Sequence, residues 1–202
     1  MSLFTQPYHD AVAQLTGPGA PFEVINCSIE GLSLKAFSQA HSSLSDYLNG
    51  GRQHGDKLLL QYQESTWSFK EFYTAADRLS HWLVTEGNIT AGTPVAIAMR
   101  NRPEWLIAFV AIINVGGIAV PLNSWGKSAE LEQGLEDSHA ALLICDAPRW
   151  KYVQKSNRIV SALIVDGDAS GPQQPDFRDV IRANWTGSIT PPAIGTQTPS
   201  IL

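Results

Sequence analysis

The residues from Trp105 to Leu122 form an almost unbroken apolar run, in which Asn114 is the one strongly polar side chain. By length alone, such a run could span a bilayer. The glycine pair Gly116-Gly117, however, divides it into a part of helical length and a strand-length part, Ile118–Leu122. A buried helix that leads into a buried strand explains this division, whereas a transmembrane helix does not. We therefore expect a chain with a buried core and no transmembrane segment.

Strand-like and helix-like segments alternate around this run. Strands are expected at Pro94–Met99, Ile118–Leu122, Ala141–Cys145 and Ala162–Val165. Helices are expected from Asn101 onward, from about Ser128 to Asp137, and over Asp146–Lys155 and Asp176–Trp185. Alternation at this spacing is typical of a mainly parallel sheet with helices on both faces, so the predicted fold class is α/β.

The N-terminal part has a different pattern. A short helix is expected at Tyr8–Leu15, followed by strands Phe22–Ile29 and Leu32–Phe37, which Glu30-Gly31 joins into a hairpin. A helix over Leu44–Leu48 comes next, and then a strand, Leu58–Tyr62, which returns at Thr66-Trp67 after a tight turn at Glu64-Ser65.

The clearest local signal is the capping box that begins at Ser68. The Ser68 hydroxyl can accept from the backbone N–H of Glu71, while the Glu71 side chain reaches back to the cap. A helix with one buried face is therefore expected up to Gly87. Its apolar residues recur at spacings of three and four: Phe69, Phe72, Ala76, Leu79 and Leu83.

Composition excludes some classes of protein. The net charge is −5 and no basic stripe is present, so a nucleic-acid partner is not expected. Two cysteines, Cys27 and Cys145, cannot build a disulfide framework and suit a reducing cytoplasm, and both are expected to be buried structural thiols. Residues 1–185 are expected to form the α/β unit, and 186–202, rich in Thr, Pro, Gly and Ser, a linker or ragged end.

Residues with recognisable chemistry are scarce. The five histidines show no spacing typical of metal ligands, and Asp166-Gly167-Asp168 is interpreted as a turn. Gly126-Lys127-Ser128 imitates the end of a phosphate-binding loop, but Pro121 stands where such a loop needs glycine, and Leu122 and Trp125 crowd it. We interpret it as a strand-to-helix turn with Ser128 as the cap. No residue is assigned a catalytic, cofactor-binding or metal-binding role.

The stretch from Gly55 to Asp146 resembles the N-terminal region of acyl-CoA synthetases of the adenylate-forming superfamily. Four pieces carry the resemblance in order and spacing. Residues 67–72 look like a W-T/S-F/Y-x-E-L helix start, and residues 94–105 like a strand and helix ending N-x-P-E-W. Residues 116–123 look like G-A-V-x-V-P-L-N, and residues 135–140 like L-x-D-S-G/E-A. Together the four are far more specific than any one of them.

The resemblance implies the N-terminal subdomain of an enzyme that activates a carboxylic acid as acyl-AMP with ATP and Mg²⁺ and then transfers it to the CoA thiol. The upstream hairpin, from Pro21 to Phe37, resembles branches that act on medium- or long-chain fatty acids. The Ser/Thr/Gly-rich phosphate loop that ends in Lys, and the lysine of the C-terminal domain, have no counterpart among these 202 residues. The chain by itself is therefore expected to be inactive, with no cofactor of its own.

Two other hypotheses stay open. The chain could be a naturally short binding or interaction module of the same fold, or an unrelated doubly wound nucleotide-binding domain, which the missing glycine fingerprint disfavours. A piece of a larger enzyme should expose an apolar face and self-associate, whereas a self-sufficient module should not. Trp125 and its loop could border the acyl or CoA site of a complete enzyme, since ligands of open α/β sheets lie at the carboxyl ends of the strands.

Overall fold

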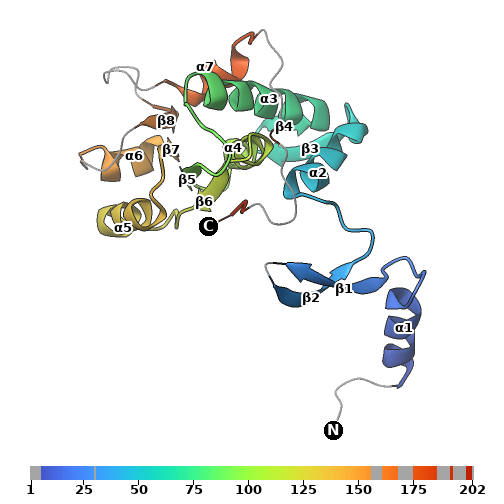
Figure 1. The fold of residues 1–202 in the computed structure, drawn as a ribbon. Coiled ribbons are helices and arrows are strands. Elements are labelled where there is room, and N and C mark those ends of the chain that lie inside the picture. The colour runs from blue at the N-terminus through green and yellow to red at the C-terminus, as the bar shows by residue number, and fades with distance from the viewer. Residues whose placement is uncertain are drawn as a thin grey trace.

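The structure is a computed structural model, and it describes residues 6–29, 31–155, 161–167, 175–185, 192 and 199–201. Its centre is a four-stranded sheet with the order β6-β5-β7-β8, in which every pair of neighbours is parallel (Figure 1). The bounds are β5 Pro94–Ala98, β6 Ile118–Pro121, β7 Leu142–Asp146 and β8 Ala162–Val165. The predicted α/β class with a parallel sheet is confirmed.

Helices cover both faces of this sheet. On one face lie α3 (Phe69–Thr85), α4 (Pro103–Asn114) and α7 (Phe177–Arg182), and on the other lie α5 (Ser128–Ser138) and α6 (Ala147–Val153). Side chains alternate along the strands: in β5, Val95 and Ile97 belong to the first core while Ala96 and Ala98 belong to the second. The sequences of these strands are therefore almost continuously apolar, because both faces of the sheet are buried.

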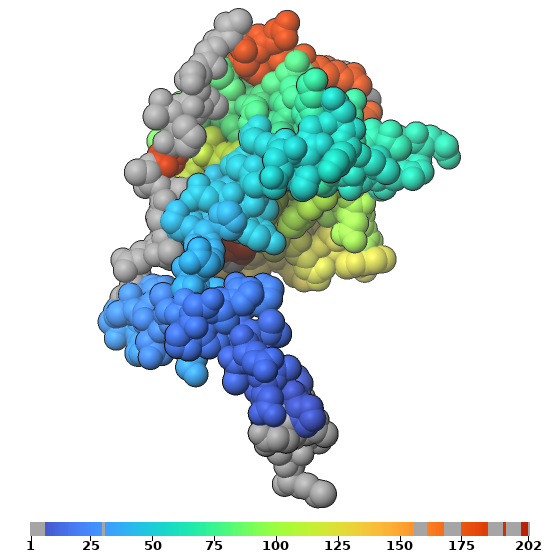
Figure 2. Space-filling view, turned by 90° about the vertical axis from the view of Figure 1, so that its right-hand side faces the viewer, coloured from blue at the N-terminus to red at the C-terminus, as the bar shows by residue number. Residues whose placement is uncertain are grey.

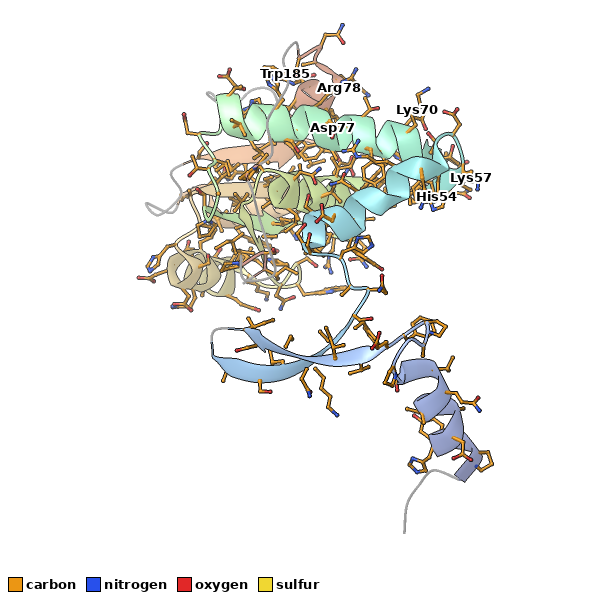
Figure 3. The ribbon with its side chains drawn as sticks, turned by 45° about the vertical axis from the view of Figure 1, so that its right-hand side comes forward. His54, Lys57, Lys70, Asp77, Arg78 and Trp185 are labelled. Carbon is orange, nitrogen blue, oxygen red and sulfur yellow. The ribbon has the colours of Figure 1, made fainter. Side chains whose placement is uncertain are left out.

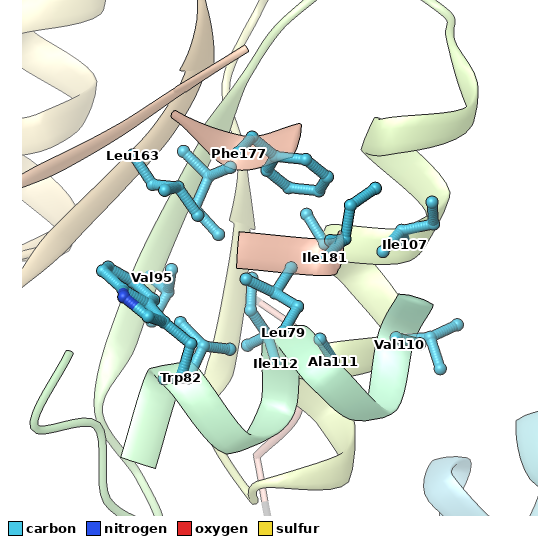
Figure 4. Packing of buried hydrophobic residues seen from close by; sticks show 14 of the residues in the cluster. Leu79, Trp82, Val95, Ile107, Val110, Ala111, Ile112, Leu163, Phe177 and Ile181 are labelled. Carbon is cyan, nitrogen blue, oxygen red and sulfur yellow. The ribbon is translucent and has the colours of Figure 1, made fainter. Parts of the chain in front are cut away.

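The first core is the larger. Leu79 and Trp82 of α3 pack against Ile112 of α4, and Phe177 and Ile181 bring α7 over them (Figure 4). Phe177 and Leu79 have no exposed surface. α7, far along the chain, thus closes the layer that α3 and α4 begin.

The capping box at the start of α3 is confirmed. Glu71 N donates to Ser68 Oγ at 3.2 Å, and Ser68 N donates to Glu71 Oε2 at 2.8 Å. The bond from the Ser68 backbone, followed by the bond from its hydroxyl, lowers the pKa of Glu71. The cap fixes where α3 begins, and with it the face that Leu79 presents to the sheet.

The apolar run divides where the sequence indicates. α4 begins with Pro103 and ends at Asn114, and β6 starts at Ile118. Gly116 has a φ of +74°, and a Cβ on Gly117 would lie 3.0 Å from a methyl group of Ile112, so both positions favour glycine. Among the described residues, none of the helices has the length and hydropathy needed to cross a membrane.

The N-terminal arm consists of α1 (Gln6–Thr16) and a hairpin of β1 (Val24–Ile29) and β2 (Leu32–Phe37), and it projects from the body (Figures 1 and 2). α2 (Leu44–Asn49), η1 (Gly50–His54) and the hairpin of β3 (Leu58–Tyr62) and β4 (Ser65–Ser68) then lead into α3. Several large apolar side chains of the arm are exposed: Tyr8, Val12, Leu15, Phe22, Ile25, Leu32, Leu34 and Phe37.

Some local predictions were wrong by small amounts. The turn of the second hairpin lies at Gln63-Glu64, one residue earlier than expected, and Gln63 has a φ of +52°. α7 ends at Arg182 because Ala183 adopts an extended conformation. Ser128 does not cap α5: Lys127 holds that position, and Ser128 Oγ donates to the Tyr152 carbonyl at 2.8 Å.

The expected linker at 186–202 lies mostly outside the described residues, as does Glu30 of the first hairpin, and the linker stays a prediction. Two described residues of that range contact β6. The Ser200 carbonyl accepts from Ala119 N at 2.9 Å, and Ile201 pairs with Ala119 in parallel. The outer edge of β6 is therefore partly covered by this short segment.

Leu79→Ala should lower the free energy of unfolding by about 2–5 kcal/mol, because it leaves a cavity where α3 meets the sheet. The matched control is Leu106→Ala on α4, whose side chain is exposed, and it should cost about 1 kcal/mol or less. Urea unfolding followed by circular dichroism measures both. Equal costs for the two variants would contradict the packing described here.

Candidate functional site

The carboxyl ends of β5 and β7 define the most constrained edge of the molecule. These strands are neighbours, yet the chain leaves β5 toward β6 on one side and leaves β7 toward β8 on the other. Such a reversal of direction opens a crevice between the two loops, and ligands of open α/β sheets bind there. The candidate functional site is therefore this edge, with the loops that follow β5, β6 and β7.

A buried ion pair occupies the crevice. Arg149 Nη1 lies 3.1 Å from Asp146 Oδ2, and the two side chains are only 8% and 5% exposed. Arg149 also donates to the Ser124 carbonyl, from Nε at 2.9 Å and from Nη2 at 2.7 Å. Asp146 accepts from the backbone N–H of Arg100 at 3.2 Å and caps α6. One ion pair thus ties together the loops after β5, β6 and β7.

The loop that Arg149 holds presents Trp125, which is 78% exposed. The guanidinium of Arg100 lies 3.2 Å from the centre of the Trp125 ring, a cation–π contact. Trp125 N donates to Asn123 Oδ1 at 3.0 Å, which fixes the turn. The structure thus places Trp125 at the expected edge of the sheet, on a backbone that Arg149 holds through the Ser124 carbonyl.

The loop at Gly126-Lys127-Ser128 does not fit a phosphate group. Asn123 Nδ2 donates to Glu130 Oε1 at 2.7 Å, which holds a carboxylate against the loop. A Cβ on Gly126 would lie 3.1 Å from Glu130 Oε2, so this negative charge sits where phosphate oxygens would need donors. The interpretation of this segment as an ordinary strand-to-helix turn agrees with that geometry.

A second charged cluster lies beside the first, at the ends of β5 and β8. Arg102 donates to Glu104 Oε2 and to Asp166 Oδ2, both at 2.8 Å, and Arg178 Nη2 lies 2.7 Å from Asp166 Oδ1. Burial alone would lower the pKa of Arg102, but the hydrogen bonds and charges of Glu104 and Asp166 outweigh it and raise that pKa. Arg102 therefore stays charged at every physiological pH.

This second cluster was missed from the sequence. Asp166 was interpreted as part of a turn, which its φ of +56° agrees with, but its carboxylate also joins two arginines from distant segments. Asp168 lies outside the described residues. Within the described ranges, no three His, Cys, Asp or Glu side chains gather closely enough to hold a metal ion. Both clusters, with their charges paired, serve as a rigid frame.

Cys145 places a thiol next to the ion pair. Burial, and then the negative charge of Asp146, raise the pKa of this thiol, and Arg149 offsets only part of the effect. The thiol is therefore protonated and inert at neutral pH, as expected of a structural cysteine. Cys27 differs, because the hairpin leaves it partly exposed, so the expectation that it is buried was wrong.

Arg149→Met should lower the free energy of unfolding by about 3–5 kcal/mol, because it leaves the buried Asp146 carboxylate without its opposite charge. Replacing both residues, as Asp146→Leu with Arg149→Met, should recover more than half of that loss. Urea unfolding of the single and double variants measures the difference. A single variant within about 1 kcal/mol of the wild type would show that the pair carries little stability.

Iodoacetamide at pH 8 should alkylate Cys27 in the folded chain and leave Cys145 unmodified, because alkylation requires an accessible thiolate. Mass spectrometry of proteolytic peptides reads out both sites. In urea, the two thiols should react at similar rates. Modification of Cys145 in the folded chain at the rate of Cys27 would contradict its burial.

Comparisons with known proteins agree with this frame. The sequence signature of the family described as AMP-binding enzyme matches residues 49–197. The linear gramicidin synthase of Brevibacillus parabrevis is 28% identical over 117 residues, which are 58% of this chain and 2% of that protein. The very long-chain fatty acid transport protein of Saccharomyces cerevisiae is 27% identical over 125 residues, 57% of this chain and 19% of that protein.

A solved structure shows the same fold. It is the N-terminal subdomain of Klebsiella oxytoca NpsA in complex with 3-hydroxybenzoyl-AMSN, with a TM-score of 0.60 and 18% sequence identity. The match covers 80% of this chain and 37% of that one, so the chain spans well under half the length of these relatives. The signature and the fold agree, and the chain belongs to the AMP-binding enzyme family, as part of its N-terminal region.

Proposed function

We propose that this chain is the N-terminal part of a longer ATP-dependent acid–thiol ligase. Such an enzyme joins a carboxylate to the α-phosphorus of ATP, which releases pyrophosphate and leaves an acyl-AMP. A thiol then attacks the acyl carbon, and AMP departs as the thioester forms. The observation that carries the proposal is the family signature over residues 49–197, which coincides with the sheet and its tied carboxyl edge.

The role proposed for this segment is to hold a wall of the site. Catalysis of adenylation needs positive groups and Mg²⁺ aimed at the phosphates. Two arginines of the described edge are instead paired with carboxylates, Arg149 with Asp146 and Arg102 with Glu104 and Asp166, and a third, Arg100, lies against the Trp125 ring. The proposal therefore assigns ATP, Mg²⁺ and the thiol to the whole enzyme and expects no activity from these 202 residues alone.

The identities of the acid and of the acceptor thiol are more specific proposals. We propose a medium- or long-chain fatty acid and CoA, which the N-terminal hairpin and the similarity to the yeast fatty-acid protein support. The similarity to linear gramicidin synthase gives no such support, because the name of that protein specifies neither a fatty acid nor CoA. A cytoplasmic location stays a prediction from the two cysteines.

Trp125 is the residue of this segment that we expect to border the acyl or thiol site. It is large, exposed and held on a fixed loop, which are features of residues that anchor a ligand or a neighbouring domain. In the complete enzyme, Trp125→Ala should raise the KM for the acid or the thiol without changing that for ATP. A change confined to ATP would contradict this placement.

ATP–pyrophosphate exchange with a panel of carboxylic acids tests the proposal in the full-length protein. Exchange should appear with one class of acid and be absent for residues 1–202 alone. Lys127→Ala is the matched control: it should leave the KM for ATP unchanged, because the loop around Lys127 holds a carboxylate in place of phosphate donors. Absence of exchange with every acid, or a large loss in Lys127→Ala, would overturn this account.

The alternative is a naturally short binding module of the same fold, and the native transcript distinguishes the two. If translation continues past Leu202 into a Ser/Thr/Gly-rich loop ending in Lys, the ligase proposal stands. If the reading frame stops there, this chain cannot adenylate and the module takes its place. Self-association through the apolar arm is expected of an isolated segment, so a clean monomer by light scattering favours the module.

A further inference from the structure

A cavity of about 400 Å³ lies beside the middle of α3, next to α2, η1 and the end of α4. Ser45 and Asn49 of α2, Arg52 of η1, four residues of α3, the end of α4 and Trp185 line it. Asn114 and Val115 lead directly into β6, so the cavity lies toward the amino ends of the strands. This volume falls within the range of small-molecule sites, and neither the resemblance nor the proposed function assigns it.

The wall of the cavity is partly aromatic. The rings of His81 and Trp185 stack with centroids 5.0 Å apart and an interplanar angle of 24°. Trp185 Nε1 donates to the Val180 carbonyl at 3.1 Å, which holds the ring beside α7. His81 Nδ1 is buried and has no hydrogen-bond partner within the described part of the chain. A buried nitrogen without a partner is costly, and a ligand could satisfy it.

Unused donors surround this wall. Asn114 Oδ1 accepts from Ser45 Oγ at 3.1 Å and from Asn49 Nδ2 at 2.8 Å, so the amide is oriented, and none of the described residues accepts from its Nδ2. Arg78 uses Nη1 for the Ile181 carbonyl at 2.9 Å, and its other N–H groups have no partner among the described residues. Figure 3 shows Arg78 and Trp185 beside α7, along the side of α3 that α7 borders.

The charges of the cavity do not cancel. Arg52 and Asp77 form a two-bond pair, with Arg52 Nη1 at 2.9 Å and Nη2 at 2.5 Å from the carboxylate, and they neutralise each other. Arg78 carries the remaining charge of the lining. A cation with free N–H groups, an oriented amide donor and an aromatic wall together favour an anion with a small organic body.

We propose that this cavity binds a small molecule that carries a carboxylate or phosphate group. The anionic oxygens accept from Arg78 and from Asn114 Nδ2, and the rest of the molecule lies against Trp185 and His81. The lining of this cavity contains no residue of the two charged clusters at the carboxyl edge, although Arg78 also borders a neighbouring pocket that Arg102, Glu104 and Arg178 line.

The test is a titration of the ¹⁵N-labelled chain, followed by the NMR signal of the Trp185 indole N–H, which a Trp185→Phe variant assigns. Sodium phosphate, sodium citrate and sodium chloride are added in separate experiments at constant ionic strength. A saturable shift with phosphate or citrate, and none with chloride, is expected, and the stronger of the two identifies the anion. Equal shifts with all three salts, or no shift with any, would overturn the proposal.

Asn114→Asp is the sharpest variant, because an aspartate oxygen can still accept from Ser45 and Asn49 while the donor is lost and a negative charge enters the cavity. Affinity should fall at least about tenfold. Asn101→Asp, an exposed position on the loop after β5, adds the same charge elsewhere and should leave affinity unchanged. Equal affinity in wild type and Asn114→Asp would refute the site.

Arg78→Gln provides a second measurement if Asn114→Asp alters the fold, which the amide spectrum reveals. It removes the charge and keeps an N–H donor that can reach toward the Ile181 carbonyl, and it should also weaken binding at least about tenfold. Arg182→Gln, on α7 but outside the lining of this cavity, is its control. Equal losses in both arginine variants would show nonspecific charge attraction rather than a site.

Discussion

The carboxylate of Asp146 is buried at the point where three strand ends meet, and it is paired with the guanidinium of Arg149. Burying a carboxylate is costly unless it is paired and its lone pairs are filled. Here the ion pair also connects the loops after β5 and β6, because Asp146 accepts from the Arg100 amide and Arg149 donates to the Ser124 carbonyl. The positions of Trp125, of the loop before α5 and of the start of α6 all depend on this pair.

Most of the fold could be predicted from the sequence, because it rests on local signals that agree with one another. The capping box at Ser68, Pro103 at the first turn of α4 and the glycine pair at 116 and 117 each stop or start an element at a definite residue. The misplacements arose where two turn chemistries compete, as at Gln63, which takes the left-handed conformation without being glycine.

For the candidate site, only its location could be predicted from the sequence, and its contacts could not. Strand order puts Trp125 at the carboxyl edge, and Asp146 and Arg149 are only three residues apart at the start of α6, but nothing local in the sequence joins Arg149 to Ser124 or Arg102 to Asp166. Those contacts depend on which strands become neighbours, which is decided by the whole chain. Lys127 misleads for a different reason: the three-residue motif alone is compatible with a phosphate loop, but a hydrogen bond from Asn123 holds the Glu130 carboxylate against that loop.

Hydrogen exchange at the amide of Arg100 tests the central claim most directly. This N–H follows the end of β5 and has the Asp146 carboxylate as its acceptor. The account predicts that it exchanges as slowly as the amides inside β5, and that Asp146→Ala accelerates it at least about a hundredfold while those amides remain protected. Rapid exchange of the Arg100 amide in the wild-type chain would show that the ion pair does not hold this edge together.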